Sequence, residues 1–190
     1  MYDQQATMLN CMSVRALILP GLYDSGPEHW QTLWERDDPT FVRVVQRDWE
    51  TPIRQEWVGE LETAVGATGP DVVLIAHSAG CALAAFWAAA TTLRIRGALL
   101  VAPADTEAES YPLGPKGWRP LPLVRLPFPS IVVASSNDSF ATLDRAQAFA
   151  DSWGSRFVPI GEAGHINAES GLGCWPRGRE LLAELLVPDL

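Results

Sequence analysis

Six short apolar runs alternate along this chain with longer stretches of helical pattern. Several of these runs are apolar without interruption, as strands covered on both faces must be. Strands are expected at residues 16–19, 42–45, 72–76, 98–101, 131–134 and 156–158. Helices are expected at residues 29–35, 56–65, 79–90, 143–153 and 179–186, with Pro188 ending the last. This alternation predicts a three-layer α/β domain with a parallel sheet and helices on both faces.

The chain length of 190 residues suits one domain. We expect that domain at residues 14–190, after a loose leader at residues 1–13 that lacks the pattern of a secretory signal. One segment differs from the rest, because residues 103–129 hold seven of the fifteen prolines. Proline fixes φ and lacks an N–H group. We therefore predict an ordered loop over the C-terminal edge of the sheet, and no large cap domain.

Residues 76–80 read Ala-His-Ser-Ala-Gly and stand between an expected strand and a helix of small residues. This is the nucleophile-elbow pattern with alanine in its first position. The turn is so sharp that Ser78 must adopt a strained conformation, which lifts its Oγ clear of the sheet. Ala76 and Gly80 are small, as they must be where strand and helix nearly touch. The alternative, a serine that only caps a buried helix, explains less of the pattern. We predict that Ser78 is a nucleophile.

A neutral serine needs a general base, and the chain has three histidines. His165 lies in a loop after the last expected strand, which is where the base follows this type of elbow. His77 is adjacent to Ser78, and we expect its side chain to pack in the elbow. His29 begins the first helix, where a supporting role is expected. His165 is therefore the predicted base.

The acid that orients the base should follow the strand at residues 131–134. Asp138 stands there and can accept the Nδ1–H of His165, which fixes the tautomer and stabilises the imidazolium. A purely local role for Asp138 in an Asx turn is one alternative. Asp105, which follows the preceding strand, is the other candidate acid.

An oxyanion hole needs two N–H donors. One is the backbone N–H of Ala79, which follows the nucleophile. The other is expected from the loop at residues 21–23, with Leu22 as donor because Gly21 permits the required turn. Aromatic side chains near these motifs are candidates for a substrate pocket, although packing in the core is the alternative: His29, Trp30, Phe140 and Trp175.

Two long segments and several short ones carry a family resemblance. Residues 20–31 read PGLYDSGPEHWQ and residues 161–173 read GEAGHINAESGLG, and shorter motifs stand at residues 76–81, 100–103 and 128–138. From about Arg15 to Leu186 the chain resembles the retinoblastoma-binding-protein-9-like family of serine hydrolases, which includes the bacterial YdeN proteins. The resemblance implies a small α/β-hydrolase fold with a Ser78–Asp138–His165 triad. In such a fold the six strands take the order 2-1-3-4-5-6.

The composition excludes some classes of partner. A net charge of −9 repels phosphate backbones and anionic lipids, and no apolar run reaches the roughly 18 residues of a membrane span, so neither nucleic acid nor membrane is expected. Three irregularly spaced cysteines favour reduced thiols and a cytoplasmic location. No zinc-binding pattern is present, and we expect no metal and no cofactor. A monomer or weak homodimer acting on a small molecule is expected.

These residues predict hydrolysis of a small ester, thioester or amide through an acyl-Ser78 intermediate, as in a carboxylesterase. A catalytically weak protein-interaction module with the same fold is one alternative, although it would not need all three triad groups. An acyltransferase that uses the same triad is another, and the sequence does not separate it from a hydrolase. The stiff loop at residues 103–129 is too short to enclose a long acyl chain, which favours short acyl groups.

Overall fold

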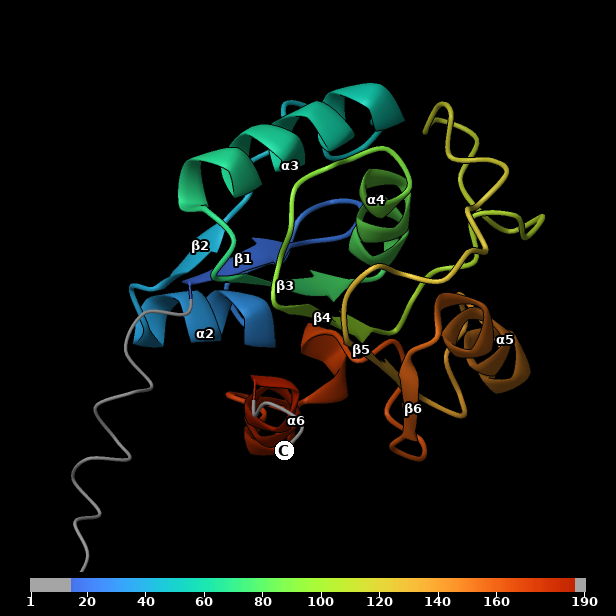
Figure 1. The fold of residues 1–190 in the computed structure, drawn as a ribbon. Coiled ribbons are helices and arrows are strands. Elements are labelled where there is room, and N and C mark those ends of the chain that lie inside the picture. The colour runs from blue at the N-terminus through green and yellow to red at the C-terminus, as the bar shows by residue number, and fades with distance from the viewer. Residues whose placement is uncertain (1–14, 187–190) are drawn as a thin grey trace, which may run out of the picture.

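The computed structural model describes residues 15–186, so the expected leader at residues 1–13 and Pro188 lie outside the described part. Six strands form one sheet: β1 (Arg15–Leu19), β2 (Phe41–Arg43), β3 (Val72–His77), β4 (Gly97–Val101), β5 (Ser130–Ala134) and β6 (Arg156–Pro159). Every neighbouring pair is parallel, and the strand order is β2-β1-β3-β4-β5-β6 (Figure 1). The predicted strand order is confirmed.

In the described part of the chain, five α-helices cover the sheet: α2 (Trp30–Asp37), α3 (Arg54–Thr68), α4 (Ala79–Ala88), α5 (Leu143–Trp153) and α6 (Pro176–Leu186). The helices α3, α4 and α5 lie on one face and α2 and α6 on the other (Figure 1). Strand side chains alternate between the two faces. On β3, Leu74 packs in the core beneath α3 and α4, whereas Val73 and Ile75 pack in the core beneath α2 and α6. Both faces of the central strands are therefore buried.

Most boundaries differ from the sequence prediction by one to three residues, and two of the differences have a clear physical reason. The strand β2 ends at Arg43, not at residue 45, because the register pairs Arg43 with Ile18 near the end of β1 and the chain then leaves the sheet. Val45 consequently lies on the surface, with 69% of its area exposed. The last helix begins at Pro176 and not at residue 179, since proline suits the first position of a helix, where no N–H acceptor is available.

Residues 102–129 connect β4 to β5 without helix or strand, as the prolines predict. The loop is attached to the body of the molecule at several points. Lys116 exchanges backbone hydrogen bonds with Pro52 and Arg54, and the Trp118 indole N–H donates to the Pro52 carbonyl at 3.1 Å. Tyr111, Trp118, Leu121 and Leu126 are buried in the core. The loop is therefore held in one place by backbone hydrogen bonds and by its own buried side chains.

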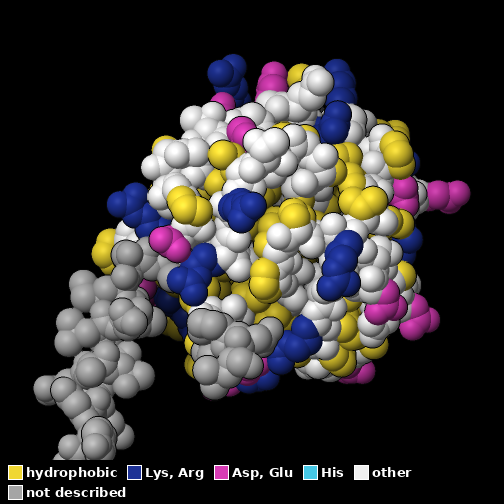
Figure 2. Space-filling view, in the orientation of Figure 1, with side chains coloured by type: hydrophobic (Ala, Val, Ile, Leu, Met, Phe, Trp, Pro, Cys, Tyr) yellow, Lys and Arg dark blue, Asp and Glu magenta, His cyan; other side chains and the backbone are white. Residues whose placement is uncertain are grey.

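The surface of the molecule mixes charged and apolar side chains. On the face that Figure 2 shows, Lys and Arg side chains and Asp and Glu side chains lie scattered between apolar ones. Neither sign of charge dominates this face. Within residues 15–186, no helix is both long enough and apolar enough to cross a membrane.

Candidate active site

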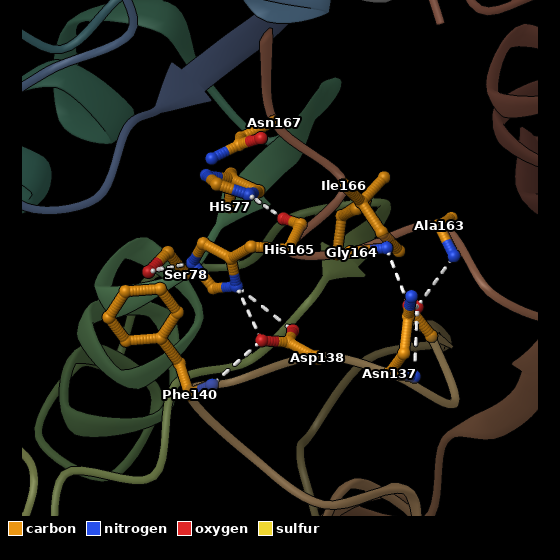
Figure 3. A network of polar contacts seen from close by, with 12 residues as sticks. His77, Ser78, Asn137, Asp138, Phe140, Ala163, Gly164, His165, Ile166 and Asn167 are labelled. Atoms are coloured by element: carbon orange, nitrogen blue, oxygen red, sulfur yellow. Dashed lines mark hydrogen bonds and ion pairs between the residues drawn. The ribbon is translucent and has the colours of Figure 1, made fainter. Parts of the chain in front are cut away.

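Ser78 joins β3 directly to α4 in a strained conformation. Its φ is +56° and its ψ is −123°, a combination that L-residues rarely adopt. Although Ser78 stands at the N-cap of α4, its side chain makes no capping hydrogen bond. Its Oγ lies instead 2.8 Å from Nε2 of His165 (Figure 3). The geometry is that of a nucleophile elbow and not of a helix cap.

Two glycines allow the backbone to pass close to this elbow. A Cβ at Gly80 would lie 2.2 Å from the Leu19 carbonyl oxygen, so α4 could not approach β1 with any larger residue. A Cβ at Gly21 would lie 2.7 Å from the Ser78 Cβ. Gly21 was expected to supply a turn, but it is not among the residues with positive φ. Residue 21 must be small because the loop after β1 lies directly against Ser78.

His165 and Asp138 meet at the carboxyl ends of the strands. The Nδ1 of His165 lies 3.0 Å from Oδ1 and 2.9 Å from Oδ2 of Asp138 (Figure 3). Only 9% of the His165 side chain and 4% of the Asp138 side chain is exposed. Asp138 Oδ1 also accepts the backbone N–H of Phe140 at 2.8 Å, so its carboxylate is oriented from both sides. Ser78, His165 and Asp138 thus form one continuous chain of hydrogen bonds.

A polar network joins the two loops that carry Asp138 and His165. Asn137 Oδ1 accepts the backbone N–H of Gly164 at 2.7 Å, and the Ser135 Oγ accepts that of Ala163 at 2.8 Å (Figure 3). The Ser135 hydroxyl in turn donates to Asn137 Oδ1 at 2.8 Å. Because these bonds bridge the loop after β5 and the loop after β6, they set the separation between Asp138 and His165.

Asp105, the other candidate acid, lies in a different arrangement. Its carboxylate pairs with the Arg145 guanidinium, with Oδ2 at 3.0 Å from Nε. Arg145 also pairs with Glu107 at 2.6 Å. The Asp105 backbone N–H donates to the Phe140 carbonyl, which ties the loop after β4 to the loop after β5. In this structure Asp105 supports the neighbouring loop and Asp138 contacts the histidine.

His77 packs in the elbow, with its side chain directed away from the Ser78 Oγ. Its Nε2–H donates to the backbone carbonyl of His165 at 2.8 Å (Figure 3). Burial, with smaller contributions from His29 and His165, lowers the His77 pKa well below its usual value, so this ring is neutral at pH 7. The His165 ring lies between His77 and Phe140, at centroid distances of 4.8 and 4.3 Å. His77 therefore helps to hold the loop that carries His165.

A cavity of about 360 Å³ opens at Ser78. The candidate oxyanion residues Leu22 and Ala79 both line it. Neither residue's N–H donates to a carbonyl in the turns and loops of residues 15–186, and the first N–H of a helix has no partner within the helix. Both N–H groups are therefore free to bind a ligand oxygen.

Two of the four predicted pocket residues line this cavity and two do not. His29 and Phe140 are in its wall. The prediction for Trp30 and Trp175 was wrong, because both are buried in the core between the sheet and the helices α2 and α6, with 1% and 4% of their areas exposed. Their ring centroids are 5.0 Å apart, and the Trp30 N–H donates to the Ile166 carbonyl at 2.8 Å. These two tryptophans support the His165 loop from beneath.

Several residues of the cavity wall were not singled out from the sequence. They come from three loops: Asp24, Tyr111, Pro112, Asn167, Ala168 and Glu169. The segments at residues 20–31 and 161–173, which carry the family resemblance, contain Asp24 and the three residues after Ile166. That signal could have located them. Within the described residues, no group of three His, Cys, Asp or Glu side chains is arranged to hold a metal ion.

The comparisons with known proteins show the family of the chain. The family model described as serine hydrolase matches residues 16–184. The chain belongs to the serine hydrolase family. A YdeN-like hydrolase from Pectobacterium atrosepticum is 34% identical, with a TM-score of 0.83, and the match covers 96% of this chain and 97% of that one. The family resemblance drawn from the sequence is thus confirmed.

More distant structures share the fold. The ydeN gene product from B. subtilis is 17% identical, with a TM-score of 0.71 and coverage of 91% of this chain and 98% of that one. A thermophilic esterase from Thermogutta terrifontis is 16% identical, with a TM-score of 0.66 and coverage of 92% and 91%. A search of curated proteins finds no match. The family and the α/β-hydrolase fold together make this chain a hydrolase in general terms.

Proposed function

We propose that this member of the serine hydrolase family cleaves small carboxylic esters, and by the same chemistry thioesters or amides, through an acyl-Ser78 intermediate. One observation carries the proposal. The hydrogen-bonded chain runs from the Ser78 Oγ through both nitrogens of His165 to the Asp138 carboxylate, at 2.8 Å and 2.9 Å. A serine activated by a base that is itself oriented by an acid is the arrangement that acyl transfer requires.

In the proposed reaction, the Ser78 Oγ attacks the substrate carbonyl carbon while His165 Nε2 takes the hydroxyl proton. The tetrahedral intermediate collapses, and His165 returns that proton to the departing alcohol, thiol or amine. Water then attacks the acyl-enzyme with His165 again acting as base, which releases the acid and restores Ser78. The Asp138 carboxylate keeps the proton on Nδ1 and stabilises the imidazolium in both halves.

The negative charge on the carbonyl oxygen needs donors that are already in place. We propose the N–H groups of Ala79 and Leu22 for this role. The N-terminus of α4 adds a favourable dipole end for that charge. The close contact between Gly21 and Ser78 supports the assignment, because it places the loop after β1 beside the nucleophile.

The size of the cavity favours small substrates. Its volume of about 360 Å³ is near the lower end of the range for ligand sites. Tyr111 and Pro112, from the loop at residues 102–129, form part of its wall, and this loop is held by buried anchors. A fixed wall cannot move aside for a long acyl chain.

A fluorophosphonate probe tests the nucleophile. We expect the wild-type protein to be labelled at Ser78, as located by peptide mass spectrometry, and Ser78→Ala to be unlabelled. Ser152→Ala removes a hydroxyl that donates to the Ala148 carbonyl on α5, outside the residues that line the cavity, and should label as wild type does. Labelling that persists in Ser78→Ala, or its absence from folded wild type, would reject the proposal.

A series of p-nitrophenyl esters tests the substrate size. We expect kcat/KM to be highest for acyl chains of roughly two to six carbons, since each methylene that cannot be buried forgoes about 0.8 kcal/mol. Chains that clash with the wall at Pro112 should react more slowly still. Activity that rises steadily to twelve carbons and increases at an oil–water interface would indicate a lipase instead.

A further inference from the structure

The loop that leads from β1 to α2 turns sharply just after Leu22, one of the two proposed oxyanion donors. Tyr23 and Asp24 have φ values of +66° and +62°, in the left-handed region that non-glycine residues seldom adopt. Six non-glycine residues among residues 15–186 have positive φ, and only these two are consecutive. A backbone in such a conformation persists only where its surroundings hold it. The contacts that hold this turn therefore decide where the Leu22 N–H lies.

The turn lies beside the nucleophile. Leu22 and Asp24 both line the cavity at Ser78. A Cβ on Gly21 would stand 3.3 Å from the Ala79 nitrogen and 2.7 Å from the Ser78 Cβ, so the backbone just before Leu22 passes next to both. A small displacement of this turn would therefore move one proposed oxyanion donor relative to the other.

Arg43, the last residue of β2, holds the turn from outside the cavity. Its side chain is only 13% exposed, and Arg43 is not among the residues that line the cavity at Ser78. Its Nη1 donates to Asp24 Oδ1 at 2.6 Å and to the Ser25 carbonyl at 3.0 Å. Its Nε and Nη2 donate to Glu35 Oε2 at 3.1 and 2.8 Å, and Nη2 also donates to the Thr32 hydroxyl at 2.7 Å. These five bonds use all five N–H groups of the guanidinium.

Other bonds anchor the two ends of the same turn. The Tyr23 N–H donates to the Trp49 carbonyl at 2.8 Å, and the Ser25 hydroxyl donates to the side-chain oxygen of the buried Gln31 at 2.7 Å. His29 begins α2 as its N-cap, since its Nδ1 accepts the Gln31 N–H at 3.1 Å. The guanidinium thus holds the middle of a turn whose ends are already fixed.

We propose that Arg43 is a positioning residue for the reaction, which keeps the Leu22 N–H in place before substrate binds. It acts through the turn at residues 23–25 and touches no substrate. The proposal rests on the function proposed above. Donors that are already aligned need no rearrangement when negative charge develops on the carbonyl oxygen. Loss of the alignment should therefore weaken binding of the transition state and leave binding of the substrate nearly unchanged.

Two substrates that differ in one atom report on the oxyanion hole. p-Nitrophenyl acetate and its thionoester release the same p-nitrophenolate, but sulfur replaces the carbonyl oxygen in the second. Sulfur is a weak hydrogen-bond acceptor, so aligned N–H donors favour the oxygen ester. The measured quantity is the kcat/KM of the oxygen ester divided by that of the thionoester. A loss of folded protein lowers both values equally and leaves this ratio unchanged.

Arg43→Gln removes the cation and most of its bonds. We expect the ratio to fall by about tenfold, which is less than the roughly 10²–10³-fold that complete loss of one oxyanion donor costs. With the oxygen ester, the loss should be in kcat at nearly unchanged KM. Arg43→Lys keeps a charge beside Asp24 but lacks the planar fork that makes five bonds, so its ratio should be intermediate.

Arg145→Gln is the matched control. Arg145 also pairs with two carboxylates, those of Asp105 and Glu107, but on a loop that carries no proposed oxyanion donor. Both variants leave two carboxylates without their cation, so both should be less stable than wild type. Arg145→Gln should nevertheless keep the wild-type ratio, and a fall equal to that in Arg43→Gln would overturn the proposal.

Asp24→Asn tests the same contact from the side of the loop. Asparagine tolerates a left-handed backbone, and its oxygen can accept the Ser25 N–H as Asp24 Oδ1 does at 2.7 Å, so the turn should still form. Without the carboxylate charge the bond to Arg43 is weaker, and the ratio should fall.

A wild-type ratio in both Arg43→Gln and Asp24→Asn would overturn the proposal, and if Arg43→Gln does not fold, Asp24→Asn decides alone. End-point fluorophosphonate labelling of Ser78 is measured in every protein. Absence of labelling in wild type would reject the proposed function itself, whereas normal labelling with an unchanged ratio would reject only the role of Arg43.

Discussion

The chain passes from strand to helix in two very different ways on either side of the active site. Between β3 and α4 there is one residue, Ser78, with φ at +56° and no side-chain cap. Between β5 and α5 there are eight residues, and the last of them, Thr142, caps α5 by accepting the Arg145 N–H at 3.2 Å. The short connection leaves a strained backbone and a hydroxyl without a local partner. The long one caps its helix with a side chain of its own and also bonds to the loop after β6.

The difference shows how the site divides its tasks. The long connection uses local bonds, such as Ser135 to Asn137 and Phe140 N–H to Asp138, to hold a carboxylate in place. The surroundings of the short connection hold it in one conformation. A side chain larger than that of glycine would not fit at Gly80 or at Gly21. The strained residue is thereby held in position, and its Oγ remains available to His165 and to a substrate.

The largest effect is expected for Asp138→Asn. This variant distinguishes the bond that Asp138 accepts from the nearby Phe140 N–H from the bond that it makes with the distant His165. Asp138→Asn can still accept the Phe140 N–H through its side-chain oxygen, so the loop should stay folded. The amide can present its NH2 group to His165 Nδ1, which favours the wrong tautomer of His165. We expect that tautomer to lower kcat by about 10⁴-fold. Steady-state kinetics on a short p-nitrophenyl ester measures this loss, and circular dichroism checks the fold.

Asp105→Asn is the matched control on the neighbouring loop. It weakens the partly exposed ion pair with Arg145, and we expect kcat to stay within about tenfold of wild type, with a stability loss of no more than about 1 kcal/mol. A large loss in Asp105→Asn beside a small one in Asp138→Asn would reverse the assignment of the acid.

The next effect concerns the histidines packed around the short connection. Burial lowers the His29 pKa from 6.5 to about 4, and it lowers that of His77 as well. Between pH 4 and pH 6.5, His29 binds more protons in the unfolded chain than in the folded one. Stability is therefore fully present above pH 6.5 and falls as the pH approaches 4, by about 3 kcal/mol for His29 alone.

Urea unfolding at several pH values measures this dependence. Carboxylates also titrate near pH 4, so the informative quantity is the difference between wild type and His29→Asn, which keeps the helix cap and lacks the imidazole. We expect the variant to lose less stability between pH 6.5 and 4. Equal losses in the two proteins would show that the folded state does not disfavour a protonated His29.

Much of this architecture could be predicted from the sequence, for identifiable reasons. The strand order was expected from the resemblance to the α/β-hydrolase fold. The positions of Ser78, Asp138 and His165 relative to the strands follow from chain order, since the carboxyl ends of parallel strands meet at one edge. The small residues around Ser78 marked the elbow because only small side chains let the strand and the helix approach so closely. These features depend on local spacing and connectivity, which a sequence contains directly.

Other features depend on where side chains point after folding. Trp30 stands beside His29 in the sequence, yet Trp30 is in the core and His29 lines the cavity. Tyr111 stands in a proline-rich loop whose path is set by distant contacts with Pro52 and Trp153. Tertiary packing decides both outcomes, and neither periodicity nor a motif records it.

The smallest effect is expected on stability, and it compares the N-terminus of α5 with that of α4. Thr142→Ala removes the hydroxyl that accepts the Arg145 N–H, and the loss of such a cap costs about 1 kcal/mol. For a protein of this size that corresponds to a fall in Tm of roughly 2–4 °C. Thr142→Ser keeps the hydroxyl and should restore most of the loss, while fluorophosphonate labelling of Ser78 should be normal in both variants.

Ser78→Ala should behave in the opposite way. Its hydroxyl caps nothing, and the strain at φ +56° is the same with either side chain because both have a Cβ. We therefore expect Tm to stay at or above the wild-type value while labelling disappears. If Ser78→Ala instead lost as much stability as Thr142→Ala and kept its activity, Ser78 would be an ordinary cap, and the contrast between the two connections would be one of length alone.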